Sequence, residues 1–116
     1  MGAKLTRTAP PPILREEVLE RICGEEAFLQ ELLKLYDEEF ASKSKALEKA
    51  VRKADFKGLR ELGHCLKGSS ANLSLPGLRA AASDLETAGK DNHLESARTA
   101  LARLKEEYAR LKSYLS

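Results

Sequence analysis

The residue types best suited to chemistry lie together in one segment, LGHCLKGSSANL, which runs from Leu62 to Leu73. It contains His64, one of 2 histidines in the chain, and then Lys67 and Gly68. An imidazole is largely neutral near pH 7, and as a nucleophile it can carry a covalent group between partners. Glycine inside a helix costs about 1 kcal/mol relative to alanine, so Gly68 indicates a role other than helix stability.

The segment is expected on a helix with an apolar inward face. Successive residues rotate by about 100° around a helix axis, which places His64 about 160° from Leu66. His64 is therefore predicted to be exposed, and Gly68 on the same face leaves room for a large group to approach the ring. The predicted inward stripe consists of Phe56, Leu59, Leu62, Leu66, Ser70 and Leu73. The other residues within about 60° of His64 by this rotation are Lys57, Arg60, Lys67 and Ala71.

Other polar residues have simpler interpretations. Ser69 and Ser70 are expected mainly to pack, because a small side chain lets two helices come close. Cys65 points about 100° away from His64 on a regular helix, so the two are predicted to share neither a metal ion nor a catalytic dyad. His93 is expected to cap a helix or to lie at the surface, and both cysteines are expected to be free thiols.

The composition is that of one helical domain. The chain has 116 residues, of which 33% are charged and 5% aromatic, and its net charge is +2. So small a net charge gives no overall case for nucleic-acid binding. No apolar run is long enough to span a membrane, and a cytoplasmic protein is expected. The sequence contains no glycine-rich nucleotide loop, no HExxH and no Ser–His–Asp arrangement. It therefore predicts no metal site and no stand-alone kinase, and a partner must complete any chemistry at His64.

The apolar periodicity predicts an all-α fold. Residues 1–12 end in three prolines and are expected to form a flexible leader, and residues 13–116 are expected to form the domain. Helices are predicted at 13–24, 25–54 and 55–73, from 76 to near Gly89, and at 94–115. Asp55 is expected to cap the third helix, Pro76 to open the fourth and Asn92 to cap the fifth. Short connections make neighbouring helices antiparallel. The predicted architecture is an antiparallel, up-down four-helix bundle with an additional short N-terminal helix across one end. A long coiled-coil dimer is the alternative, and the breaks in the pattern argue against it.

The stretch HCLKGSSANL resembles the signature of histidine-containing phosphotransfer (HPt) domains of multistep two-component phosphorelays, and the resemblance extends over about residues 13–115. It implies the four-helix fold and a phosphoryl group carried on Nε2 of His64. Lys67 matches the motif lysine that helps to neutralise this group. Gly68 matches the glycine that keeps the approach open for the partner.

The resemblance also implies the partners. A response-regulator receiver domain would exchange the phosphoryl group with His64 through its aspartate and would supply Mg²⁺, so no cofactor is expected on this chain. An upstream hybrid histidine kinase and a monomeric state are expected, with no nucleic acid and no membrane. Arg60 and Lys57 would add positive charge near the phosphoryl group, and Ala71 would extend the clearance beside Gly68.

One departure from the family pattern follows the motif. The family usually has Gly and a small residue there, whereas this chain has Ser74, Leu75 and Pro76. Leu75 is predicted to add an apolar contact to the docking surface. The pattern also lacks the aromatic-glycine ending of the chemotaxis-kinase version and favours the generic relay type.

Two other functions stay open on the sequence. The first is a non-catalytic adaptor bundle that binds a partner through its helix faces, with His64 incidental. The second is a nucleic-acid binder that uses Lys57, Arg60 and Lys67, which the small net charge and the scarcity of aromatic residues disfavour.

Overall fold

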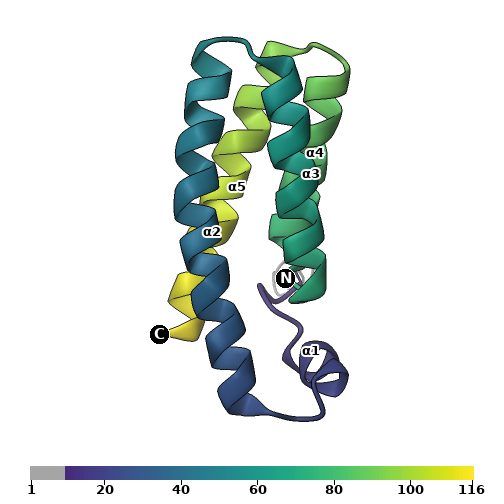
Figure 1. The fold of residues 1–116 in the computed structure, drawn as a ribbon, viewed down its shortest axis with the longest axis vertical. Helices are drawn as coiled ribbons and strands as arrows, with labels where there is room; N and C mark the ends of the chain where they lie inside the picture. Colours follow the sequence, from purple (N-terminus) through teal and green to yellow (C-terminus); the bar gives the residue numbers. More distant parts are fainter. Residues whose placement is uncertain (1–9) are drawn as a thin grey trace, which may run out of the picture.

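A computed structural model describes residues 10–116. Within this range the chain forms only helices: α1 (Arg15–Arg21), α2 (Glu26–Arg52), α3 (Phe56–Asn72), α4 (Pro76–Lys90) and α5 (Leu94–Leu115). The four long helices stand side by side, with α2–α3 and α4–α5 connected at one end and α3–α4 at the other (Figure 1). The short α1 lies at the end where α2 begins. The all-α expectation is confirmed.

The predicted leader is only partly described, because residues 1–9 lie outside the described range. Its last residues contact the bundle: Pro12 is buried, and the Arg110 guanidinium donates a hydrogen bond to the carbonyl oxygen of Pro10. Ile13, which follows, is also buried in the core. The packed part of the chain therefore begins before the predicted boundary at residue 13.

The core consists mainly of leucine and alanine side chains from all the long helices. Fully burying a leucine contributes about 1.5–3 kcal/mol, and several leucines here reach that limit: Leu29, Leu47, Leu59, Leu66, Leu85 and Leu104. A cluster of three aromatic rings, Tyr36, Phe40 and Tyr108, lies where α2 meets α5. Phe40 stacks on Tyr108 with ring centroids 3.9 Å apart, and the Tyr108 hydroxyl donates to Asp37 Oδ1 at 2.6 Å.

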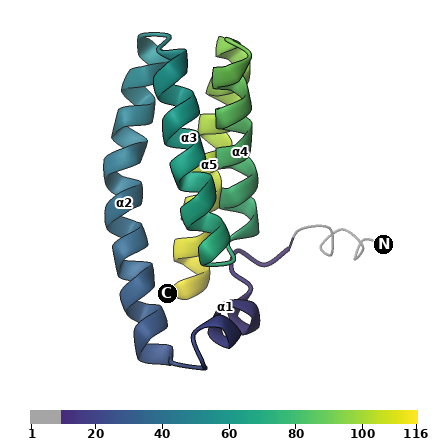
Figure 2. The same cartoon turned by 45° about the vertical axis from the view of Figure 1, so that its right-hand side comes forward.

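Helices α3 and α4 approach so closely that their backbones touch (Figure 2). A Cβ atom on Gly63 would lie 2.7 Å from the backbone nitrogen of Glu86, and one on Gly89 would lie 2.6 Å from that of Arg60. The fourth helix ends near Gly89 as predicted, at Lys90, so Gly89 lies inside the last turn of α4. Gly89 is present because any side chain there would push α4 away from α3.

The helix caps agree with the sequence in two cases and differ in a third. Asp55 caps α3 by accepting a hydrogen bond from the Gly58 N–H at 3.0 Å, and Pro76 opens α4. The expected cap at Asn92 is wrong: His93 caps α5, and its Nδ1 accepts from the Ser96 N–H at 3.1 Å. Asn92 instead has a φ of +52°, a left-handed conformation that asparagine tolerates better than most residues.

The turn between α3 and α4 holds α1 in place. Arg21 of α1 donates to the carbonyl oxygen of Asn72 at 2.6 Å and to Ser74 Oγ at 2.7 Å. The Ser74 hydroxyl in turn donates to Glu17 Oε1 at 2.6 Å. Because the last carbonyl groups of a helix lack intrahelical donors, the Arg21 guanidinium satisfies the end of α3 and complements its dipole.

Leu75 belongs to the core and not to the surface. Its exposed fraction is 0%, and its N–H donates to the Ser70 carbonyl oxygen at 2.9 Å as α3 ends. The prediction that Leu75 adds an apolar contact to a docking surface is therefore wrong. The sequence departure that it shares with Ser74 serves internal packing and the attachment of α1.

Replacing Gly63 by alanine is expected to destabilise the fold by about 1–3 kcal/mol, because the added methyl group would overlap backbone atoms of α4. The matched change Gly68→Ala on the same helix is expected to stabilise it by roughly 0.4–1 kcal/mol, since a Cβ there meets no atom within 4 Å. Urea unfolding followed by circular dichroism measures both free energies. Equal effects of the two substitutions would contradict the close contact between α3 and α4.

Candidate functional site

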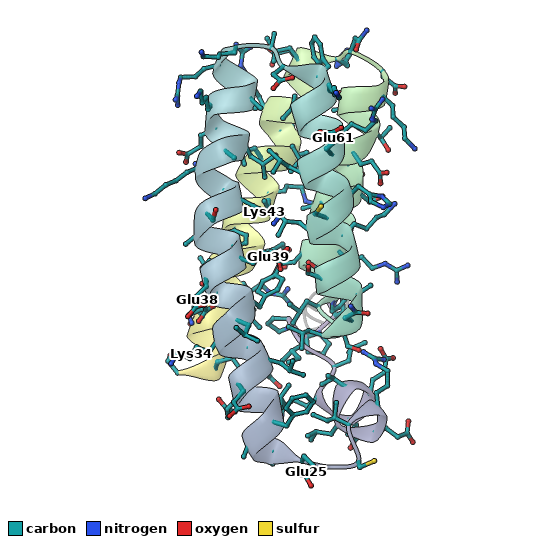
Figure 3. The ribbon with its side chains drawn as sticks, in the orientation of Figure 1. Glu25, Lys34, Glu38, Glu39, Lys43 and Glu61 are labelled. Carbon is teal, nitrogen blue, oxygen red and sulfur yellow. The ribbon has the colours of Figure 1, made fainter. Side chains whose placement is uncertain are left out.

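His64 lies on the exposed side of α3, as the helical rotation predicts. Its side chain is 69% exposed, and its Nδ1 lies 3.0 Å from Oε2 of Glu86 on α4. Figure 3 shows the labelled Glu61 on α3, which precedes His64 by about one turn. The imidazole is thus open to solvent on one side and held by a carboxylate on the other.

Glu86 determines which ring nitrogen of His64 carries the proton. The hydrogen bond from Lys67 is the main cause that lowers the pKa of Glu86, and the hydrogen bond from His64 lowers it further. Glu86 is therefore an ionised carboxylate near neutral pH, and a carboxylate can only accept hydrogen bonds. Nδ1 of His64 must then be the N–H donor, which leaves the lone pair of the neutral ring on Nε2.

Glu86 is the centre of a cluster of positive groups. Its side chain is only 9% exposed, and its Oε1 lies 2.5 Å from Lys67 Nζ. Lys90, one turn further along α4, places its Nζ 3.8 Å from Oε2, the same oxygen that His64 contacts. Burial of the carboxylate opposes its ionisation, and the hydrogen bonds from Lys67 and His64, together with the charges of the two lysines, more than offset this penalty. Glu86 is thereby kept in position as a fixed acceptor beside the imidazole.

A shallow groove between α3 and α4 contains the candidate site. It is lined by Arg60, Glu61, His64, Cys65, Glu86 and Lys90. Arg60 therefore lies beside His64 as expected, and Lys67 joins the site through Glu86. Cys65 is an exposed free thiol that reaches the same groove, although the helical rotation predicts that it points well away from His64.

Three predicted positions lie elsewhere. Lys57 is exposed near the start of α3, about two turns before His64, and makes no polar contact with it. Ala71 is half-buried and lines a small hollow beside α1, where Arg21 approaches its carbonyl oxygen. Leu75 is in the core. Clearance beside the ring therefore comes from Gly68 and not from Ala71.

Gly68 borders open space. A Cβ atom at this position would meet nothing within 4 Å, in contrast to Gly63 on the same helix. No contact inside the described part of the molecule requires a glycine at this position. A bulky residue there would leave the fold intact and would fill the space one turn beyond the imidazole.

The two serines of the motif take part in packing and hydrogen bonding within the bundle. Ser70 is fully buried, and its Oγ lies 2.8 Å from the hydroxyl of Tyr36, whose pKa is raised to about 12 by burial. Ser69 donates to Glu39 Oε2 of α2 at 2.9 Å, and Figure 3 shows Glu39 on α2 at the side that faces α3. The packing interpretation of the serines is confirmed.

Sequence reasoning missed Glu86 and Lys90. Glu86 does not stand out in the sequence, because its spacing to Lys90 is that of an ordinary solvated i,i+4 ion pair. The sequence feature that indicates the burial of Glu86 is its position on one helix face with two small residues, Ala82 four residues before it and Gly89 three residues after it. Small residues on one helix face indicate that another helix lies close, which makes a carboxylate among them a buried group.

Residues 10–116 contain neither a candidate metal site nor a candidate membrane-spanning helix. No group of three or more His, Cys, Asp or Glu side chains could hold a metal ion there. No helix in that range is both long enough and apolar enough to cross a membrane.

Replacing Lys67 by methionine is expected to raise the pKa of Glu86, because the Lys67 hydrogen bond is the largest of the effects that lower it. Lys90→Met is the matched control and is expected to raise it less. Carbon NMR titration of the Glu86 carboxyl group measures both. A greater rise in the Lys90 variant would contradict the assignment.

The same lowered pKa predicts a pH dependence of stability. A carboxyl group whose pKa is lowered in the folded state stabilises the fold fully at a pH above its unfolded-state pKa, which is near 4.5. This stabilisation is lost as the pH falls through the folded-state pKa. The advantage of the wild type over Lys67→Met in unfolding free energy is therefore expected at neutral pH and should shrink in acid. Urea unfolding at several pH values measures it, and an advantage that grows in acid would contradict it.

The comparisons with known proteins identify the family of the chain. A family model described as the Hpt domain matches residues 31–114, a span that includes His64, Lys67 and Glu86. Searches of curated proteins and of solved structures found no match to the chain. Hpt domains take part in phosphotransfer in two-component phosphorelays, where they interact with receiver domains and kinases. Because the match covers most of its length, this chain belongs to the Hpt domain family.

Proposed function

We propose that this chain is a phosphorelay intermediate whose His64 accepts a phosphoryl group from the aspartate of a response-regulator receiver domain and donates it to another. The observation that carries the proposal is the 3.0 Å contact between His64 Nδ1 and Glu86 Oε2. It leaves Nε2 as the nucleophilic nitrogen of an exposed ring. The four long helices act as an antiparallel, up-down scaffold that holds this contact.

The transfer step follows from that tautomer. The Nε2 lone pair attacks the phosphorus atom of an aspartyl phosphate, an N–P bond forms, and the P–O bond to the aspartate breaks. The aspartate leaves as a carboxylate, and the reverse reaction returns the phosphoryl group. As the N–P bond forms, the ring gains positive charge, and the Glu86 carboxylate on Nδ1–H stabilises it. Transfer of this kind depends mainly on alignment and charge stabilisation.

The positive groups in the groove offset the charge of the phosphoryl group. Arg60 and Lys90 line the groove beside His64, and Lys67 lies one turn away on α3. Lys67 is bound to Glu86 before any phosphoryl group is present, and it therefore positions the carboxylate as well as adding charge. In this proposal Mg²⁺ is bound by the receiver domain, and this chain supplies no ligand to it.

Open space at Gly68 gives the partner access to Nε2. Transfer requires the aspartate and the imidazole to come within bonding distance, so the receiver backbone must pass close to α3. The interface should be modest in size, because the chain must release one partner before it binds the next. The proposal includes an upstream hybrid histidine kinase as the source of phosphoryl groups and a monomeric, cytoplasmic chain.

His64→Gln is expected to abolish labelling by a receiver domain that carries a radioactive aspartyl phosphate, because glutamine has no nucleophilic ring nitrogen. His93→Gln is the matched control: His93 caps α5 and does not line the groove, and its replacement should leave labelling intact. Gel autoradiography against a panel of receiver domains measures both. Equal labelling of wild type and His64→Gln would overturn the proposal and would favour an adaptor bundle.

Gly68→Gln is expected to slow transfer by roughly 100-fold, because a displacement of about 1 Å from the reactive geometry can cost that factor. The fold should be retained, since the position borders open space. Ala102→Gln, at an exposed position on α5, is the control for adding the same side chain to a helix surface. Single-turnover transfer kinetics separate the two variants, and an unimpaired Gly68→Gln protein would refute the access argument.

A further inference from the structure

The near-neutral net charge conceals a separation of charge along the bundle. The end formed by the last turns of α2, the start of α3 and the end of α4 carries exposed basic side chains. We call this the basic end, and it comprises Lys49, Arg52, Lys53, Lys57, Arg60 and Lys90. Lys90 contacts Glu86, and within residues 10–116 the others have no carboxylate within ion-pair distance.

Few acidic groups compensate this charge locally. Asp55 lies between α2 and α3 and caps α3 through its carboxylate, and Asp91 follows Lys90 at the end of α4. Glu61 lies next to Arg60 on α3 (Figure 3). The nearby Glu48 is paired with Lys105 of α5, which lowers the pKa of Glu48. The basic end therefore keeps a clear excess of positive charge.

The opposite end is acidic on α1 and the first half of α2. We call this the acidic end, and it comprises Glu16, Glu20, Glu25, Glu31 and Glu38, all of them exposed. Figure 3 shows Glu25 and Glu38 on that half of α2, with Lys34 as the basic side chain among them. Arg21 of α1, Arg79 near the start of α4 and Lys112 near the end of α5 are further exposed cations at this end of the bundle, and Arg21 and Lys112 are paired with Glu17 and Asp37.

His64 lies between the two charged ends, with basic groups on one side of it along α3. Arg60 precedes it by about one turn and Lys57 by about 10 Å along the helix axis. Arg60 lies within the Debye length of about 8 Å at physiological ionic strength, whereas the effect of Lys57 at His64 is largely screened there and increases as the salt concentration falls. A partner that approaches His64 therefore meets a potential that changes sign along the molecule.

We propose that the basic end binds the carboxylate-rich surface around the acceptor aspartate of the partner and thereby sets the orientation in which the partner meets His64. The inference rests on the proposed function. The acceptor group is itself a carboxylate, and Mg²⁺ is bound through oxygen ligands, carboxylates in particular. With the phosphoryl group added, these carboxylates exceed the two positive charges of Mg²⁺, so the partner's reactive face is negative, the basic end attracts it and the acidic end repels it.

Such attraction acts mainly on the rate of encounter. Complementary potentials raise association rates by about 10 to 1000-fold, and salt removes the gain. The effect differs from stabilisation of the phosphoryl group, because a residue that only steers the partner has no influence on phosphohistidine in the isolated chain. The two roles can therefore be separated by experiment.

The test compares two charge reversals of equal size in the full chain. Lys53→Glu/Lys57→Glu alters the basic end, and Lys34→Glu/Arg79→Glu makes the same change of net charge at the other end. The second-order rate constant of transfer is measured with the receiver domain that labels the wild type fastest, at low and at high salt. Thermal unfolding shows whether each variant is folded. If Lys53→Glu/Lys57→Glu does not fold, Lys53→Gln/Lys57→Gln is used in its place.

The wild-type rate constant is expected to fall about tenfold or more with added salt. The basic-end variant should lose a similar factor at low salt and little at high salt, whereas the control should lose a clearly smaller factor, because it leaves every residue of the basic end in place. The lifetime of phosphohistidine without a partner should be unchanged in every variant.

Other outcomes overturn the inference in distinguishable ways. Labelled His64 with no salt dependence, or with equal losses in both variants, removes the basic end as a docking surface but leaves the proposed function standing. Labelling of His64→Gln overturns both. Binding of a short DNA or RNA duplex that is lost in Lys53→Glu/Lys57→Glu, with transfer unaffected, would assign the basic end to nucleic acid instead.

Discussion

The candidate site depends on backbone contact between α3 and α4 at two glycines. At Gly63 and Gly89 there is no room for a methyl group between the helices. This contact brings α4 close enough for the short reach of a glutamate to place Glu86 Oε2 against His64 Nδ1. With the usual separation of packed helices, about 8–10 Å between axes, Glu86 would be a solvated surface residue.

Once it is held between the helices, Glu86 organises the electrostatics of the groove. A carboxylate with so little exposure is costly unless it is paired, and Lys67 and Lys90 supply the pairing. The result is an ionised acceptor that selects the Nδ1–H tautomer of His64. The lysine of the motif therefore contributes to the chemistry partly through the carboxylate. In this way the packing of two helices determines the protonation of an exposed ring.

Two glycines of α3, Gly63 and Gly68, have opposite physical roles although they are five residues apart. Gly63 faces inward and permits contact with α4, whereas Gly68 faces outward and borders open space. The surrounding structure is built to hold α3 still: Tyr36 binds Ser70 in the core, and Arg21 closes the far end of the helix. A rigid helix with one open face suits a group that different partners must reach in turn.

The sequence alone determined the helices and the exposure of His64, because helical periodicity and local caps such as Asp55 act over a few residues. Its motif also indicated the family to which the chain belongs. Glu86, Lys90 and the internal role of Leu75 were decided only by tertiary structure. Their surroundings depend on which helices meet and how closely, and a buried ion pair has the same local spacing as a solvated one. The charged ends likewise emerge only when residues distant in sequence gather at one end, which the small net charge conceals.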